Sequence, residues 1–121
     1  MKNKIFVYGT LLSEEGNWRH YLKDSKLLGE DTIEGNFTMV SLGGFPGVIP
    51  EGKGTIKGEV YEVDENSYKS IEYLEGYHPD PKQAFYSKMK VNTKYGEAEM
   101  YILDKSYLDY PVIKSGNWRE R

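Results

Sequence analysis

A glutamate placed directly before a glycine, Glu75, is the residue of this chain best suited by type and position to acid/base chemistry. It follows a segment in which Tyr68, Ile71 and Leu74 recur at intervals of three, a spacing that indicates one apolar helix face. Gly76 suits the left-handed conformation just past a helix end, so we expect Glu75 to be the final helical residue. The partial negative charge of a helix C-terminus disfavours a charged carboxylate, which suits a group that takes up and releases a proton near neutral pH.

This helix has a candidate N-cap at Asp64, directly before its first turn. Taken alone, however, the stretch is more typical of a solvated glutamate at the frayed end of a surface helix. A role in proton transfer therefore depends on what the rest of the chain places beside Glu75.

The end of the first apolar run is a second candidate for chemistry. Tyr8, Gly9, Thr10 and Leu11 leave a predicted strand abruptly. Glycine lets the backbone approach a ligand closely, and consecutive amides in such a turn can form a concavity that binds an anion, for example a substrate carboxylate. A simple strand-to-helix turn is the alternative. In the same way, the segment Phe45, Pro46 and Gly47 is either a rigid loop or one wall of a pocket.

Other catalytic constellations are missing from the sequence. The chain has no cysteine, which excludes disulfides, thiolate zinc sites and a cysteine nucleophile. His20 and His78 have no metal-ligand spacing around them, and no serine lies in a Gly-x-Ser-x-Gly elbow. Phosphate-binding and dinucleotide-binding glycine loops are also lacking. We therefore expect acid/base chemistry without a metal, a cofactor or a covalent nucleophile.

The composition is that of one small globular domain. The 121 residues predict a single domain over 1–121, and a net charge of −3 with mixed signs gives no basic footprint for nucleic acid. The N-terminal apolar run is too short for a signal-peptide core or a membrane span, so we expect a cytoplasmic protein with no membrane partner. Eleven tyrosines and thirteen glycines favour a β-rich chain with many tight turns.

The elements that would position these residues follow from the apolar spacing. Alternation predicts strands, most clearly at 55–63, and clusters of glycine and proline predict loops. The expected strands are 4–8, 25–34, 37–42, 55–63, 84–91 and 97–103, with a turn at Tyr95–Gly96. The expected helices are one near Ser13 to Leu22 and one from Asp64 to Glu75. The expected loops are 43–50 and 76–83, and the tail from Lys105 is irregular.

Six motifs occur in a characteristic order along the chain. They are Val7-Tyr8-Gly9-Thr10-Leu11, Phe45-Pro46-Gly47, Gly58-Glu59-Val60-Tyr61, Leu74-Glu75-Gly76-Tyr77, Tyr86, and Ser115-Gly116-Asn117-Trp118-Arg119. Each motif is weak alone, but together and with this spacing the chain resembles the γ-glutamylcyclotransferase-like (AIG2-like) family over essentially its whole length.

The resemblance implies an α+β fold, a small mixed β-barrel with a few outer helices and a cavity at one mouth. It implies that amides around Gly9, Thr10 and Leu11 hold the substrate's α-carboxylate and that Glu75 is the catalytic acid/base. It also implies that Tyr86 lines the pocket, with Tyr101 as a weaker assignment. Lys88 stands where many relatives have an arginine, and Gly16, Asn17 and His20 depart from the usual arrangement of the first helix; both differences bear on the leaving group.

The activity implied by the resemblance is cyclotransfer. The substrate would be a small molecule with a free α-amino acid end, cleaved by intramolecular aminolysis to release 5-oxoproline. A γ-glutamyl amino acid, a γ-glutamylamine and an isopeptide-linked ε-lysine are alternative substrates. A non-catalytic module that captures a small anionic metabolite in the same pocket is an alternative of another class, and a surface-interaction protein is a third.

Overall fold

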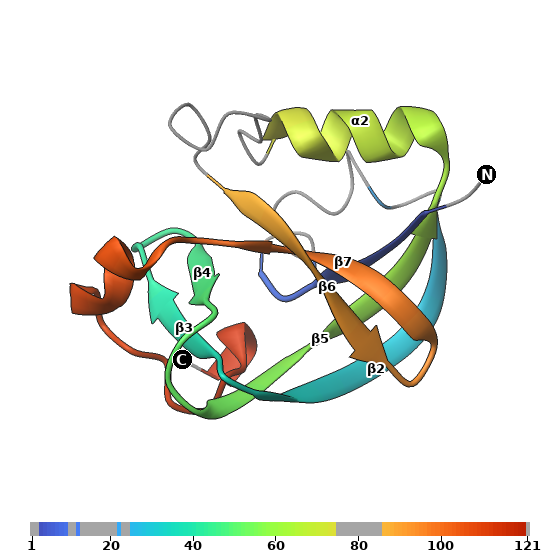
Figure 1. The fold of residues 1–121 in the computed structure, drawn as a ribbon. Coiled ribbons are helices and arrows are strands. Elements are labelled where there is room, and N and C mark those ends of the chain that lie inside the picture. Colours follow the sequence, from blue (N-terminus) through green and yellow to red (C-terminus); the bar gives the residue numbers. More distant parts are fainter. Residues whose placement is uncertain (1–2, 10–11, 13–21, 23–24, 75–85, 121) are drawn as a thin grey trace.

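The computed structural model of this protein describes residues 3–9, 12, 22, 25–74 and 86–120. Its main element is a five-stranded sheet in the order β2-β5-β1-β7-β6, beside a two-stranded sheet of β3 and β4 (Figure 1). The strands are β1 Asn3–Val7, β2 Lys26–Gly35, β3 Thr38–Ser41, β4 Pro46–Ile49, β5 Gly54–Val63, β6 Ser87–Thr93 and β7 Gly96–Ile102. The helices are α2 Glu65–Leu74 and the 3₁₀ helices η1 Lys105–Asp109 and η2 Trp118–Glu120.

Strand β1 lies at the centre of the main sheet. It pairs antiparallel with β5 and parallel with β7, so the sheet is mixed. Ile5, Phe6 and Val7 are all buried, which explains why this short run has no polar alternation. The predicted first strand is thus confirmed, and its end delivers Tyr8 and Gly9 to the middle of the sheet.

The main sheet is curled, and its two edge strands approach each other. The amide of Lys94, in the β6–β7 turn, donates to a carboxylate oxygen of Asp31 on β2 at 2.9 Å. A Cβ added to Gly29 on β2 would lie only 1.9 Å from the hydroxyl oxygen of Tyr95. In the described residues β2 and β6 are nevertheless not hydrogen-bonded neighbours. The expected mixed sheet with few helices is confirmed, but the sheet is not closed, so "barrel" describes it only loosely.

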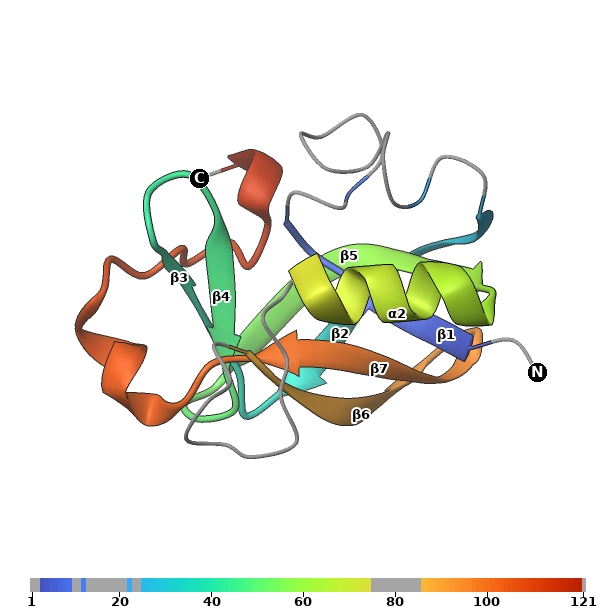
Figure 2. The same ribbon diagram turned by 90° about the horizontal axis from the view of Figure 1, so that it is seen from above.

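Helix α2 lies across one face of the sheet, over β1 and β7 (Figures 1 and 2). The carboxylate of Asp64 accepts a hydrogen bond from the Ser67 amide at 2.7 Å, which confirms Asp64 as the N-cap. Ile71 is fully buried, whereas Tyr73 is 88% exposed, as an amphipathic helix requires. The other predicted helix, near Ser13 to Leu22, and the predicted loop 76–83 fall outside the described residues, apart from isolated positions.

The glycines and prolines of segment 43–50 predicted a loop, but half of the segment is a strand. Residues Pro46–Ile49 form β4, which pairs antiparallel with β3. Pro46 occupies the first position of the strand, where a residue without an N–H is tolerated. Buried Val48 and Ile49 supply the β-branched side chains that stabilise the strand. The carbonyl of Val48 also accepts a hydrogen bond from the Leu103 amide at 2.9 Å, which joins β4 to the end of β7.

The tail from Lys105 was predicted to be irregular, but it contains the two 3₁₀ helices η1 and η2 and is hydrogen-bonded to β3. The amide of Ser41 donates to the Pro111 carbonyl and the amide of Ile113 donates to the Met39 carbonyl, both at 2.8 Å. Farther on, Trp118 is 2% exposed and belongs to the core. The tail therefore acts as a partner for β3 and contributes to the same hydrophobic core as the sheets.

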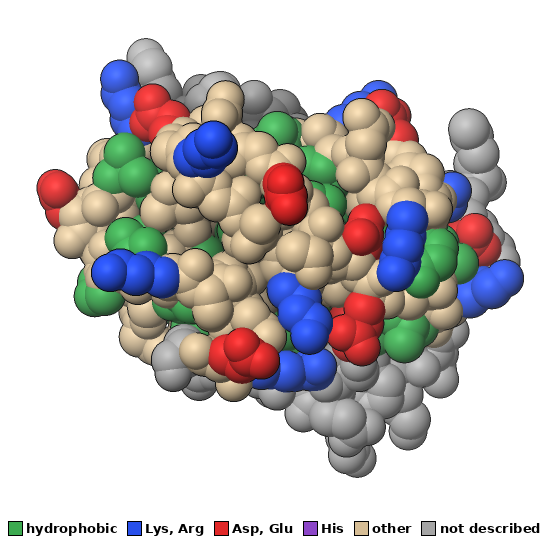
Figure 3. All heavy atoms as spheres, turned by 90° about the horizontal axis from the view of Figure 1, so that it is seen from below, with side chains coloured by type: hydrophobic (Ala, Val, Ile, Leu, Met, Phe, Trp, Pro, Cys, Tyr) green, Lys and Arg blue, Asp and Glu red, His purple; other side chains and the backbone are tan. Residues whose placement is uncertain are grey.

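The surface carries charges of both signs. On the face shown in Figure 3, Lys and Arg side chains lie among Asp and Glu side chains, and neither sign forms a continuous patch. In the described part of the chain, no helix has the length and apolar character needed to cross a bilayer.

Candidate active site

The end of β1 is fixed to β7 by a buried tyrosine. The Tyr8 hydroxyl donates a hydrogen bond of 2.7 Å to the backbone carbonyl of Tyr101. Tyr8 is 7% exposed, so this bond is made away from water and its loss would leave polar groups buried. The direction in which the chain leaves the sheet at Gly9 is thereby set.

Gly9 lies against Pro46, at the start of β4. A Cβ at Gly9 would lie 2.6 and 2.7 Å from two ring atoms of Pro46, closer than carbon atoms can pack. The carbonyl of Gly9 accepts a hydrogen bond from the Leu12 amide at 2.9 Å. The glycine expected to let the backbone approach a ligand thus lets it approach the Phe45–Gly47 segment, and it brings two of the sequence motifs together.

Tyr86 also contacts the region in which Gly9 lies against Pro46. Its hydroxyl donates to the Pro46 carbonyl at 2.7 Å, and the residue is 6% exposed. The rings of Tyr86 and Tyr101 meet edge to face, with centroids 6.5 Å apart and an angle of 77° between the planes. Two buried tyrosine hydroxyls, from Tyr8 and Tyr86, thus hold the β1 end, β4, β6 and β7 in one arrangement.

The structure therefore brings together most of the described residues that the sequence singled out. These are Tyr8, Gly9, Pro46, Gly47, Tyr86 and Tyr101. Phe45 lies at the same place but is 37% exposed, at the outer end of the segment. Thr10, Leu11 and Glu75 lie outside the described residues. Glu75 directly follows Leu74, the last described residue of α2.

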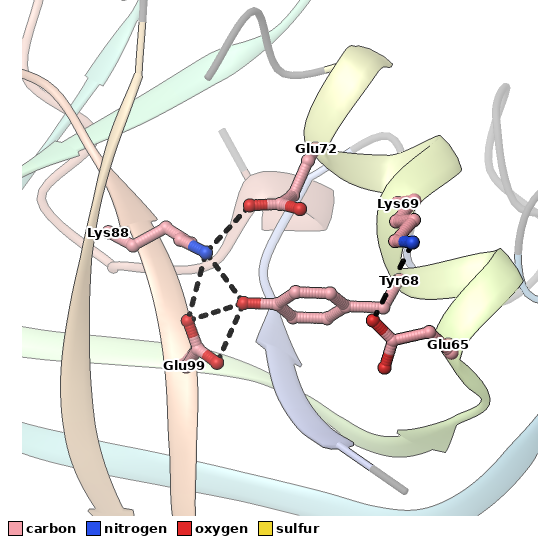
Figure 4. A network of polar contacts seen from close by, with 6 residues as sticks. All are labelled: Glu65, Tyr68, Lys69, Glu72, Lys88 and Glu99. Atoms are coloured by element: carbon pink, nitrogen blue, oxygen red, sulfur yellow. Dashed lines mark hydrogen bonds and ion pairs between the residues drawn. The ribbon is translucent and has the colours of Figure 1, made fainter. Parts of the chain in front are cut away.

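A polar cluster that sequence reasoning missed joins α2 to the sheet. The Lys88 ammonium on β6 contacts carboxylate oxygens of Glu72 on α2 at 2.8 Å and of Glu99 on β7 at 3.3 Å. It also donates to the Tyr68 hydroxyl at 2.6 Å, and that hydroxyl lies 2.8 Å from both oxygens of Glu99. Figure 4 shows the four side chains meeting between the helix and the two strands.

The protonation states of this cluster follow from its contacts. Partial burial lowers the pKa of Lys88, but the hydrogen bonds to Glu72 and Tyr68 and the charge of Glu99 outweigh it, and the pKa stands well above the usual lysine value. Burial is also the main reason why the pKa of Tyr68 is raised. At neutral pH Lys88 is therefore an ammonium and Tyr68 a neutral phenol.

A signal for this cluster existed in the sequence. Tyr68 and Glu72 lie four residues apart on one helix face, the spacing at which helical side chains are neighbours. The sequence did not reveal that this face would meet Lys88, because the packing partner of a helix face is set by the fold.

A buried carboxylate lies beneath the tail. Glu59 on β5 is 4% exposed, and one of its oxygens lies 3.8 Å from the guanidinium of Arg119. The Tyr61 hydroxyl donates to its other oxygen at 3.3 Å. The Gly-Glu-Val-Tyr motif and the final Asn-Trp-Arg motif are thus in contact, and both support the core. Among the described residues, no group of three or more His, Asp or Glu side chains is placed to hold a metal ion.

The mixed, curled sheet and the convergence of its motifs at the β1 end define a class of α+β domain that is matched by known proteins. The family model described as γ-glutamyl cyclotransferase, AIG2-like, matches residues 5–120. The chain belongs to this family.

Relatives match over nearly the whole chain. A γ-glutamylcyclotransferase family protein, ytfP, from Citrobacter rodentium is 36% identical over 118 residues, covering 98% of this chain and 96% of its own length. The crystal structure of an uncharacterized protein from Pyrococcus horikoshii is 35% identical with a TM-score of 0.78, covering 98% of this chain and 91% of that one. The solution structure of ytfP from Escherichia coli is 30% identical with a TM-score of 0.74, covering 98% and 99%.

Proposed function

We propose that this protein is a cyclotransferase that converts a γ-glutamyl amine or γ-glutamyl amino acid into 5-oxoproline and a free amine. The substrate's own α-amine attacks its γ-carbonyl carbon, and a five-membered lactam forms as the amide bond to the leaving nitrogen breaks. The proton lost by the attacking nitrogen is matched by the proton gained by the leaving nitrogen. The reaction needs neither an added nucleophile nor an oxidant.

The observation that carries this proposal is the convergence of the family's motifs at the end of β1. Tyr8 and Gly9 leave the central strand against Pro46, and Tyr86 ties the same proline's carbonyl to β6. A rigid frame of this kind suits a reaction whose nucleophile is part of the substrate, because orientation is then the protein's main task. Holding reacting groups in the correct geometry can contribute roughly 7–11 kcal/mol to lowering the barrier.

In this proposal the amides at Gly9, Thr10 and Leu11 bind the α-carboxylate, and Glu75 transfers the proton. Backbone amides at a strand end are suited to an anion. A positioned general acid/base adds about 10²–10⁴-fold to the rate. Glu75 enters directly after α2, and its carboxylate would take the proton from the substrate ammonium and return it to the leaving nitrogen.

The proposal is tested by measuring 5-oxoproline release from a panel of γ-glutamyl amino acids, γ-glutamylamines and ε-(γ-glutamyl)lysine. Wild type is compared with Glu75→Gln, which keeps the size of the side chain and removes the base. Glu65→Gln is the matched control, because Glu65 is an exposed carboxylate of α2 in a pair with Lys69 at 4.0 Å. We expect release by wild type and Glu65→Gln and a loss of about 10²-fold or more in kcat for Glu75→Gln.

The outcomes separate the proposed enzyme from its rival. Near-full activity of Glu75→Gln would show that Glu75 is not the general acid/base. The absence of release from every substrate would instead favour a binding module, and ligand-induced thermal shifts with small carboxylate metabolites would then be the measurement to make. The best substrate in the panel identifies the leaving group.

A further inference from the structure

The cluster around Lys88 has no part in the proposed chemistry, yet two of its members are close in sequence to residues of the candidate site. Glu72 is three residues before Glu75, and Lys88 is two residues after Tyr86. The side chains of Lys88, Glu72 and Glu99 are 15%, 25% and 25% exposed, so the ion pairs are largely shielded from water. Buried pairs of this kind are far more sensitive to the loss of one partner than surface pairs are.

The cluster joins α2 to two strands. Glu72 lies in the last turn of the helix, and Tyr68 lies one turn earlier; both contact Lys88 of β6, and Tyr68 also contacts Glu99 of β7 (Figure 4). The other ion pair of the helix differs. Glu65 and Lys69 are exposed, and both lie on α2, so their pair does not connect the helix to the sheet.

Lys88 also lies on the strand that carries a wall of the candidate site. Tyr86 directly precedes β6, and the alternation of the strand extends to it: Tyr86 is buried and Lys88 half-buried, while Ser87 between them is exposed. Tyr86 holds β4 through the Pro46 carbonyl, and Lys88 holds α2 through Glu72. One side of β6 thus sets the distance between the β1–β4 region and the end of the helix.

Loss of Lys88 would do more than remove its ion pairs with Glu72 and Glu99 and its hydrogen bond to Tyr68. The carboxylates of Glu72 and Glu99 would then face each other across the gap between helix and sheet without the cation that separates them. Like charges in a partly shielded place repel, so the last turn of α2 would move away from the strands. Tyr68 cannot replace the cation, because its phenol is neutral.

We propose that Lys88 is a positioning residue that holds the last turn of α2 against β6 and β7, and thereby sets where Glu75 enters the site. The catalytic consequence rests on the proposed function, whereas the anchoring of the helix does not. Glu72 is the link between them, since it precedes Glu75 by three residues in the sequence.

The test compares Lys88→Met with Lys90→Met, two substitutions on the same strand. Lys90 is the matched control because its side chain is 70% exposed and its pair with Glu97 lies at 3.6 Å on the surface. Amide hydrogen exchange of residues 71–74 measures the anchoring directly. We expect exchange at these amides about tenfold or more faster in Lys88→Met than in Lys90→Met, after correction for any change in global unfolding.

Kinetics measure the consequence. At a temperature where both variants are fully folded, we expect kcat of Lys88→Met to fall about 10–10²-fold while KM changes about twofold at most, because Lys88 is proposed to position Glu75 and not to bind the substrate. Lys88→Arg keeps the charge and should restore most of kcat. Glu72→Gln provides a second test if Lys88→Met does not fold.

Equal exchange at residues 71–74 in Lys88→Met and Lys90→Met would overturn the proposal, whatever the activity. An unchanged kcat despite faster exchange would overturn the positioning of Glu75. If exchange is faster in Lys88→Met but the wild type releases no 5-oxoproline, the anchoring of α2 by Lys88 is supported and the proposed cyclotransferase function is contradicted. The failure of one proposal is therefore distinguishable from the failure of the other.

Discussion

At the scale of single residues, Gly9 sets how closely β1 and β4 approach. A Cβ at this position would lie 2.6 Å from a ring carbon of Pro46, and the proline ring cannot rotate away. We expect Gly9→Ala to lower the free energy of unfolding by about 1–3 kcal/mol, as overpacking does. Gly44→Ala is the control, because a Cβ there meets no atom within 4 Å. Urea denaturation measures both, and equal midpoints would show that the contact with Pro46 is not tight.

Tyr86 provides a second prediction at this scale. Its hydroxyl is the donor to the Pro46 carbonyl, and both residues are buried. Tyr86→Phe keeps the ring and removes the donor, so we expect a loss of about 1–3 kcal/mol of stability, the cost of an unsatisfied buried group. Tyr73→Phe, at an 88% exposed position, should change stability by less than about 0.5 kcal/mol. Thermal unfolding of the two variants side by side would contradict the prediction if they were equally stable.

The residue scale also shows where sequence reasoning succeeded and where it could not. The motif residues Tyr8, Gly9 and Pro46 were identifiable because glycine and proline constrain the backbone locally, and the structure places them in contact. Glu99 was read only as a strand residue, and Lys88 only as a difference from many relatives that bears on the leaving group. Their proximity to Glu72 depends on how α2 packs on the sheet, which is a property of the fold and leaves no local pattern.

At the scale of elements, the N-cap of α2 is open to a direct test. The Asp64 carboxylate accepts the Ser67 amide at 2.7 Å. We expect Asp64→Ala to cost about 1 kcal/mol of stability, because an orphan amide of the first turn loses its acceptor. Asp64→Ser retains an acceptor and should remain close to wild type. Guanidinium denaturation followed by circular dichroism distinguishes them, and a fully stable Asp64→Ala would mean that another group or water caps the helix.

Strands were predictable where burial alternates or where an apolar run is bounded by turns. The clearest prediction, 55–63, corresponds to β5 Gly54–Val63. Strand β4 was missed because Pro46 and Gly47 are strand breakers by propensity. Tertiary contacts override that propensity, since Gly47 packs so tightly that a Cβ would lie 2.0 Å from Leu103. Glycine here is required by the close packing of β4 on the end of β7.

At the scale of the whole molecule, the tail was predicted only as irregular. Its pairing with β3 and its hydrogen bond from the Lys57 amide to the Gly116 carbonyl, at 2.8 Å, are long-range contacts that no periodicity signals. Trp118, in the last of the sequence motifs, is nevertheless a core residue. The final motif thus joins the tail to β5 and to the core, and we expect the tail and the sheet to unfold as one cooperative unit.

Gly116 tests that cooperativity. Its φ is +66°, and a Cβ would lie 1.7 Å from the Thr55 carbonyl oxygen, so alanine meets both backbone strain and a clash with β5. Gly43 has a φ of +100° but no atom within 4 Å of the added Cβ, so Gly43→Ala isolates the strain, which costs about 1–2 kcal/mol. We expect Gly116→Ala to lower the free energy of unfolding by clearly more than Gly43→Ala does. If the tail is part of the cooperative unit, Gly116→Ala should raise the hydrogen-exchange rate of the Lys57 amide and lower the midpoint of global unfolding, measured by circular dichroism, by matching amounts. Faster hydrogen exchange at the Lys57 amide with an unchanged midpoint of global unfolding would show instead that the tail detaches independently of the sheet.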